Sequence, residues 1–202
     1  MIGGHLAELT LTTFLTLDGV MQAPGGPNED TSGGSPLADA DMGKTIAEIF
    51  SKADAFLLGR TTYDIFSAYW PRITDPNDPI ASKLNSLPKF VASRSRSQFA
   101  WSGSCHVRDV AKDVADLKKR FAREVQVHGS CGLAQTLIEN DLIDEYRLLT
   151  FPVLLGRGKR LFGTGTVSAT LKLVRSGTTS AGVVISVYRR GGALKTGSFA
   201  LD

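Results

Sequence analysis

Near its beginning the chain has a two-residue period of side chains, which is typical of a strand with one buried face. From Leu9 to Leu17 every second residue is leucine or threonine, and Asp18-Gly19 then ends the segment with a turn. From Gln22 to Gly43 the sequence is rich in Pro, Gly, Ser, Asn and Asp. A loop of this length is uncommon in a compact domain, so we expect either a lid or binding loop, or a surface loop without fixed structure.

Four units follow, each with a stretch of helical period and then a run of strand character. In the first, Ile46, Ile49, Phe50 and Ala53 have the i, i+3, i+4, i+7 spacing of a helix with one apolar face. In the third, Asp109 stands in the N-cap position of a similar pattern. Helices that alternate with strands imply crossover connections and a largely parallel sheet. The predicted helices lie at 46–53, 61–69, 80–87, 110–121 and 132–138, and the predicted strands at 55–58, 89–93, 125–127 and 144–155.

After Leu155 the pattern changes to two strands, 169–174 and 183–189, joined by a segment rich in Ser, Thr and Gly. This spacing predicts an antiparallel pair. The expected fold class is α/β with three layers: a mixed, mostly parallel sheet, helices on both faces, and an antiparallel C-terminal hairpin. We expect a single domain over residues 1–190 and a C-terminal tail over 191–202, which is either frayed or docked on another subunit.

Composition narrows the class of protein. The 202 residues include 23 basic and 20 acidic side chains, a net charge of +3 that gives no strong attraction to nucleic acid. Cys105 and Cys131 have no disulfide-scaffold or metal-ligand spacing, so no metal site is expected. The chain has no signal-peptide pattern and no apolar run of about 18 residues, which favours a soluble, cytoplasmic protein without a membrane partner.

Small and basic residues gather at three predicted strand ends, where anion binding requires them. Two of the three runs open helices, whose first N–H groups are free to bind phosphate. The third offers hydroxyl and guanidinium groups suited to a terminal phosphate. Each run alone is also explained as a turn glycine or a solvated arginine. The carboxyl ends of parallel strands, however, meet at one edge of a sheet, so the three runs together indicate a binding site for a dinucleotide. The runs are Gly59-Arg60-Thr61-Thr62, Ser93-Arg94-Ser95-Arg96, and Gly129-Ser130-Cys131-Gly132.

Competing motifs are incomplete. Gly43-Lys44-Thr45 resembles the end of a P-loop but lacks its first glycine, and neither GxGxxG nor a GxSxG elbow occurs. ATP binding at a P-loop, an ordinary Rossmann fingerprint and a hydrolase triad are therefore not supported. Cys131 stands at a helix start, where it is either a stabilised thiolate or a small residue in a glycine-rich turn.

The order of five runs resembles the dihydrofolate-reductase-like superfamily. Within it, the chain is most similar to the C-terminal reductase domain of the bifunctional riboflavin-biosynthesis deaminase-reductases and its stand-alone relatives, over roughly residues 6–190. No zinc motif of the deaminase half is present. The runs are Thr13–Gly19, Leu58–Tyr63, His128–Ser130, Asp144-Glu145 and Phe151–Gly158.

The resemblance implies an NADPH-dependent reductase of the 5-amino-6-(5-phosphoribosylamino)uracil reductase type, acting on a small heterocyclic, carbonyl or imine substrate. Asp18 would face the nicotinamide and substrate as a catalytic acid, or would be only a turn residue before Gly19. By position, the cofactor phosphates would be held by Gly59, Arg60, Thr61 and Thr62, the 2′-phosphate end by Ser93 and Arg94, and the pyrophosphate by Gly129, Ser130, Cys131 and Gly132.

Two departures from the family concern the substrate. His128 stands where many riboflavin-pathway reductases carry the glutamate of a Glu-Gly-Gly triplet, and the acidic residue of the first helix of dihydrofolate reductases has no assigned counterpart here. A pterin- or nucleotide-binding protein of the same fold without turnover is therefore the alternative. The apolar segment Phe151–Leu155 and the tail would build a homodimer interface, in an enzyme or in a purely structural partner protein.

Overall fold

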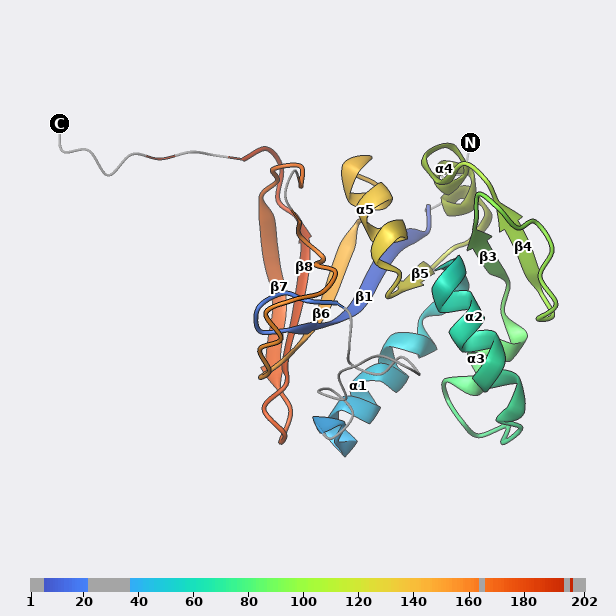
Figure 1. Ribbon diagram of the computed structural model, residues 1–202, viewed down its shortest axis with the longest axis horizontal. Helices are drawn as coiled ribbons and strands as arrows, with labels where there is room; N and C mark the ends of the chain where they lie inside the picture. Colours follow the sequence, from blue (N-terminus) through green and yellow to red (C-terminus); the bar gives the residue numbers. More distant parts are fainter. Residues whose placement is uncertain (1–5, 22–36, 164–165, 195–196, 198–202) are drawn as a thin grey trace.

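The structure is a computed structural model that describes residues 6–21, 37–163, 166–194 and 197 (Figure 1). Its eight strands form one sheet in the order β4-β3-β2-β5-β1-β6-β8-β7. The strands from β4 to β6 are all parallel, whereas β8 is antiparallel to both β6 and β7. The predicted fold class is therefore confirmed. The strands are β1 (Glu8–Thr16), β2 (Ala53–Gly59), β3 (Lys89–Ala92), β4 (Ser104–Val107), β5 (Glu124–His128), β6 (Glu145–Phe151), β7 (Leu171–Thr178) and β8 (Val184–Arg190).

Helices cover both faces of the sheet (Figure 1). The sheet has a hydrophobic core on each face, and alternate residues of β2 belong to different cores. Phe56 and Leu58 pack with side chains of α1, α2 and α3, whereas Ala55 and Leu57 pack with side chains of α4 and α5. Each face of the parallel part of the sheet is thus closed to water by its own layer. The helices are α1 (Ala40–Ser51), α2 (Arg60–Tyr69), the 3-10 turn η2 (Trp70–Arg72), α3 (Ala81–Ser86), α4 (Val110–Arg120) and α5 (Cys131–Glu139).

Local sequence explains where the helices begin. Asp39 caps α1 by accepting a hydrogen bond from Met42 N at 2.8 Å, and Asp109 caps α4 by accepting from Lys112 N at 3.2 Å. The predicted N-cap of α4 is confirmed. The predicted loop over 22–43 is wrong at its end, because the Asp39 cap starts α1 before Gly43. Its remainder, residues 22–36, lies outside the described residues.

Three strand predictions need correction. β4 was not predicted, because this edge strand has only Val107 buried and so shows no apolar period. β6 ends at Phe151, since Pro152 has no N–H to continue the ladder. The strand β7 continues to Thr178, through the segment predicted as a turn. The tail over 191–202 falls mostly outside the described residues.

Some classes of site do not occur in the described part of the chain. No helix there is long and apolar enough to cross a membrane. The same residues contain no cluster of three or more His, Cys, Asp or Glu side chains arranged to hold a metal ion. Cys105 and Cys131 are both free thiols.

Candidate functional site

A cavity of about 990 Å³ lies at the carboxyl ends of β2, β3 and β5. These strands are neighbours, with β2 between the other two, so their ends meet at one edge of the sheet. The three predicted anion-binding runs come from these ends. All the residues predicted to bind the cofactor line this one cavity: Gly59, Arg60, Thr61, Thr62, Ser93, Arg94, Gly129, Ser130, Cys131 and Gly132.

Three helices start at the cavity wall. The first residues of α2, α4 and α5 all line it. At α2 and α5 the N-cap residues, Gly59 and Ser130, make no side-chain capping bond, whereas Asp109 caps α4. The free N–H groups and the positive ends of the α2 and α5 dipoles therefore favour an anion at this place.

Basic side chains surround the same cavity. Arg108 and Lys112 line it together with the predicted Arg94, and they come from the end of β4 and the first turn of α4. Because β3 and β4 are adjacent and parallel, with Ala92 opposite Val107, the residues after the two strands lie side by side. Sequence reasoning missed Arg108 and Lys112 because it missed β4. Asp109 and Asp113 also line this end and partly balance the charge.

Hydrogen bonds of the Ser130 side chain join the ends of β2 and β5. Gly129 and Ser130 have φ values of 59° and 64°, two consecutive left-handed residues. The Ser130 Oγ accepts a hydrogen bond from Gly59 N at 3.0 Å and donates to Thr62 Oγ1 at 2.5 Å. A Cβ atom on Gly59 would lie 2.6 Å from Ser130 Oγ, so a side chain does not fit there. The two turns predicted to hold phosphates are thus fixed relative to each other.

The end of β3 is fixed by hydrogen bonds around Ser93. Its N–H donates to Val107 O at 3.2 Å, its Oγ accepts from Arg96 N at 3.0 Å, and its carbonyl lies 2.8 Å from His106 Nε2. Arg94, which follows, is exposed and lines the cavity. Arg96 lines a second cavity of about 930 Å³, where its guanidinium lies over the ring of Phe99. The structure therefore separates two arginines that sequence reasoning grouped.

Asp18 does not belong to the described residues that line the first cavity. Its carboxylate accepts hydrogen bonds from Thr16 Oγ1 at 2.6 Å, Gly156 N at 2.8 Å and Leu155 N at 3.2 Å. The Thr16 hydroxyl, followed by these N–H groups, lowers the pKa of Asp18 to about 2 despite some desolvation. Asp18 is therefore ionised at neutral pH and ties the turn after β1 to the segment after β6. A catalytic role for Asp18 remains a prediction.

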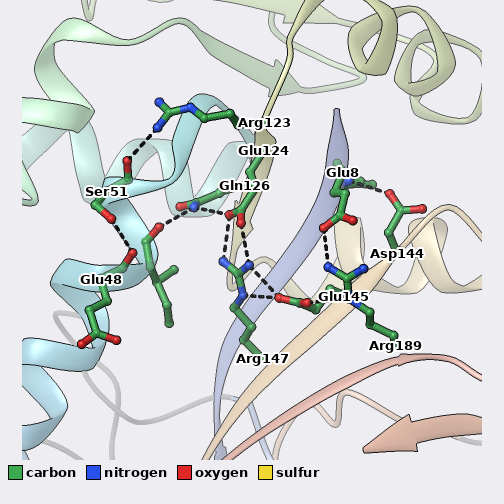
Figure 2. Close-up of polar contacts among 12 residues, drawn as sticks. Glu8, Glu48, Ser51, Arg123, Glu124, Gln126, Asp144, Glu145, Arg147 and Arg189 are labelled. Atoms are coloured by element: carbon green, nitrogen blue, oxygen red, sulfur yellow. Dashed lines mark hydrogen bonds and ion pairs between the residues drawn. The ribbon is translucent and has the colours of Figure 1, made fainter. Parts of the chain in front are cut away.

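A buried polar cluster lies on the α1 side of β5, β1 and β6 (Figure 2). Arg147 donates to both carboxylate oxygens of Glu124, at 2.9 and 2.8 Å, and to Glu145 at 2.7 Å. Arg189 joins Glu145 to Glu8 through contacts of 2.9 and 2.7 Å. Burial alone would raise the pKa of Glu145, but Arg147 and Arg189 outweigh it and the pKa is lowered. The cluster is thus an ionised network that ties four strands together, and sequence reasoning did not predict it.

His128 ends β5 on the same side. It is 7% exposed, and its ring stacks on Phe50 of α1 with centroids 4.3 Å apart. Its Nε2 lies 3.0 Å from Gln126 Oε1. Burial, and then the charge of Arg147, lower the pKa of His128 to about 3, so the imidazole is uncharged at neutral pH.

Comparisons with known proteins agree with this architecture. A family model described as the RibD C-terminal domain matches residues 7–185. The uncharacterized protein YyaP of Bacillus subtilis strain 168 is 31% identical over 187 residues, which is 92% of this chain and 96% of that protein.

Solved structures share the fold at lower identity. A putative riboflavin biosynthesis protein from Shewanella sp. PV-4 matches with a TM-score of 0.70 and 21% identity, covering 91% of this chain and 98% of that one. A pyrimidine reductase-like protein from Corynebacterium diphtheriae matches with a TM-score of 0.61 and 13% identity, over 91% and 92% of the two chains. A Thermotoga maritima diaminohydroxyphosphoribosylaminopyrimidine deaminase/5-amino-6-(5-phosphoribosylamino)uracil reductase matches with a TM-score of 0.63 and 15% identity, over 92% of this chain and 57% of that one.

Proposed function

The chain belongs to the RibD C-terminal domain family, and from that premise we propose that it is an NADPH-dependent reductase of the riboflavin-biosynthesis type. The observation that carries this proposal is the single cavity into which all the predicted cofactor residues converge. Its volume of about 990 Å³ lies at the upper end of the usual range for small-molecule sites. The substrate we propose is a small heterocycle, or a carbonyl or imine compound.

The cavity has the chemistry that a dinucleotide phosphate requires. Gly59 lets the turns after β2 and β5 approach each other closely, because a Cβ atom there would lie 2.6 Å from Ser130 Oγ. The uncapped first turns of α2 and α5 would hold the pyrophosphate through their N–H groups. Arg60 stands at the first position of α2 and would add a charge to the same group.

A preference for NADPH over NADH is supported by the other end of the cavity. Arg94, Arg108 and Lys112 lie together there and would hold the 2′-phosphate that only NADPH carries. These three cations outnumber the two carboxylates at the same end, Asp109 and Asp113, so a positive charge remains that a neutral ribose hydroxyl does not require. Ser93 would add a hydroxyl to the same group.

Bound NADPH would supply the hydride, and the chain would supply position and exclusion of water. Asp18 and His128, which follow β1 and end β5, are poor acids, since Asp18 is a carboxylate and His128 is an uncharged imidazole at neutral pH. We therefore propose that the proton comes from water. In this account Asp18 acts by holding the segment after β6 in place.

The alternative is a pterin- or nucleotide-binding protein of the same fold without turnover, which the ionised state of Asp18 and the uncharged state of His128 favour. NADPH oxidation, followed by absorbance with a panel of pterins, pyrimidines and small carbonyl compounds, separates the two functions. A substrate-dependent loss of NADPH that Arg60→Ala abolishes supports the reductase. Tight binding of NADPH with no oxidation by any member of the panel supports the alternative.

We also propose a homodimer. Within the segment Phe151–Leu155, Leu154 is 70% exposed, while Phe151 is buried and packs edge-on against Phe14. The edge strand β7 adds the exposed Leu173 and Val174 to the surface available for a partner. Sedimentation velocity tests this, and a single species with the mass of one chain would contradict it.

A further inference from the structure

Hydrogen bonds run along β5 from the buried charged cluster to His128. Arg147 binds Glu124, and the Glu124 Oε2 lies 2.7 Å from Gln126 Nε2. The same Nε2 lies 2.6 Å from the carbonyl oxygen of Ile49 in α1, and Gln126 Oε1 lies 3.0 Å from His128 Nε2. Glu124, Gln126 and His128 are alternate residues of one strand, so their side chains follow one another on one face (Figure 2 shows the first part of this chain of contacts).

The direction of every bond in this series is determined by chemistry. A guanidinium only donates, and a carboxylate bound by it only accepts. The amide group of Gln126 that faces both the Glu124 carboxylate and the Ile49 carbonyl must then be the NH₂ group, because two acceptors need a donor. Its oxygen is left to face His128, so the His128 Nε2 must carry a proton to donate to it.

The surroundings of His128 hold the ring in that orientation. Phe50 stacks on one side at an interplanar angle of 22°, and Phe56 lies 5.8 Å away, centroid to centroid. The charge of Arg147 also acts on His128 and disfavours a second proton on the ring. The uncharged ring therefore has its proton on Nε2 and its lone pair on Nδ1.

The backbone just after His128 needs such support. Gly129 adopts its positive φ without steric cost, whereas a left-handed non-glycine residue such as Ser130 persists only where the neighbouring structure enforces it. On the side of Ser130 the turn is held by Gly59 and Thr62. On the side of His128 it is held by the bond from Gly129 N to Thr12 O at 3.0 Å, and His128, the residue before Gly129, is itself packed against Phe50 and Phe56.

We infer that the series Arg147–Glu124–Gln126 holds His128 as an uncharged imidazole with its proton on Nε2, and that His128 so held is a positioning residue for the left-handed Gly129–Ser130 turn. It is not a proton donor to a ligand. The effect on cofactor binding rests on the proposed function, whereas the assignment of the proton does not.

Nitrogen-15 NMR of the full chain labelled at histidine tests the proton assignment directly. The signals of His5 and His106 are identified with the variants His5→Gln and His106→Gln. The expected result is a third histidine that remains uncharged at neutral pH and has its proton on Nε2. A proton on Nδ1, an imidazolium, or a mixture of tautomers would overturn the inference.

The variant Gln126→Met, which keeps the volume but removes both polar atoms, tests the positioning role. We expect mixed tautomers at His128 and a Kd for NADPH raised by roughly fivefold or more, as the left-handed turn relaxes. Gln98→Met, an exposed glutamine on the second cavity, is the control and should change neither.

Glu124→Gln adds a second variant in case Gln126→Met does not fold. It removes the carboxylate that accepts from the Gln126 NH₂ group and leaves the Ile49 carbonyl as an acceptor, so the Nε2 tautomer should give way in part to a mixture of tautomers. A folded Glu124→Gln variant with the Nε2 tautomer unchanged would overturn the role of the series. A wild-type chain that binds no dinucleotide would refute the proposed function and leave the NMR test intact. Unchanged NADPH binding in a folded Gln126→Met variant would refute the positioning role alone.

Discussion

Replacing Arg147 by methionine removes the shared cation of two buried carboxylates. The Arg147 side chain is 5% exposed, and those of Glu124 and Glu145 are 10% and 8% exposed. Glu145 retains Arg189 in the variant, but Glu124 retains only the amide of Gln126. The change therefore leaves one carboxylate in the interior without a compensating charge.

The size of the effect follows from that burial. Breaking a buried ion pair by removing one partner costs about 3–5 kcal/mol, because the remaining charge stays desolvated. The free energy of unfolding of a domain is about 5–15 kcal/mol, so Arg147→Met is expected to lose roughly a fifth of it or more. The exposed pair Lys119–Asp116, 64% and 70% exposed, provides the control, and Lys119→Met should cost no more than about 0.5 kcal/mol.

The pH dependence gives a second signature. In the wild type the pKa of Glu145 is lowered, so its contribution to stability is present above the unfolded pKa near 4.5 and is lost as the pH falls. In Arg147→Met, Glu145 loses one of the two cations that lower its pKa, so less of this pH-dependent contribution remains. The difference in free energy of unfolding between the two proteins is therefore largest near neutral pH and shrinks toward pH 4.

Urea denaturation followed by circular dichroism measures this difference. The wild type, Arg147→Met and Lys119→Met are compared at neutral pH and again at about pH 4.5. A loss below about 1 kcal/mol at neutral pH, or a loss that is the same at both pH values, would refute the ionised network.

Three further predictions concern the cavity and its support. Arg94→Ala should weaken NADPH binding, measured by calorimetry, by roughly tenfold and NADH binding much less, because the lost bond is to the 2′-phosphate. Equal losses of affinity for the two dinucleotides would show that Arg94 is misassigned. Gly59→Ala should lower the free energy of unfolding, measured by urea denaturation, by about 1–3 kcal/mol, because its Cβ would lie 2.6 Å from Ser130 Oγ. Gly132 has open space around it, so Gly132→Ala should not lower the free energy of unfolding. Asp18 stabilises the fold above about pH 4, and this contribution is lost as the pH falls toward 2. Asp18→Asn should therefore flatten the acid limb of melting temperature against pH, and an unchanged limb would contradict the role of its carboxylate as acceptor for Thr16, Leu155 and Gly156.

Much of the fold was predictable because leucine or threonine recurs at every second position of β1 and β2 contains a short apolar run that ends at Gly59. The spacing of strands and helices also placed the carboxyl ends of β2, β3 and β5 at one edge, and the cavity there confirms that geometry. The strand β4 was not predicted because an edge strand needs little apolar surface. Without β4, the place of the Arg108 and Lys112 cations at the cavity was not predicted either. The hydrogen bond between Gly59 N and Ser130 Oγ joins residues 71 positions apart, which no local sequence pattern reveals.

The polar face of β5 shows the other limit. Glu124-Val125-Gln126-Val127-His128 alternates strictly, and such alternation usually means a strand with one face in water. In the fold β5 lies between β2 and β1 and is buried throughout. Only the topology shows that these polar residues must satisfy one another, and the alternation in a central strand was the one available signal.

The central claim is that the cavity at the ends of β2, β3 and β5 binds a phosphorylated dinucleotide. A crystal structure of the protein grown with NADPH tests it most directly. We predict the pyrophosphate against the first turns of α2 and α5, and the 2′-phosphate beside Arg94 and Arg108. A dinucleotide bound elsewhere on the molecule, or crystals in which this cavity stays empty at millimolar NADPH, would contradict the account.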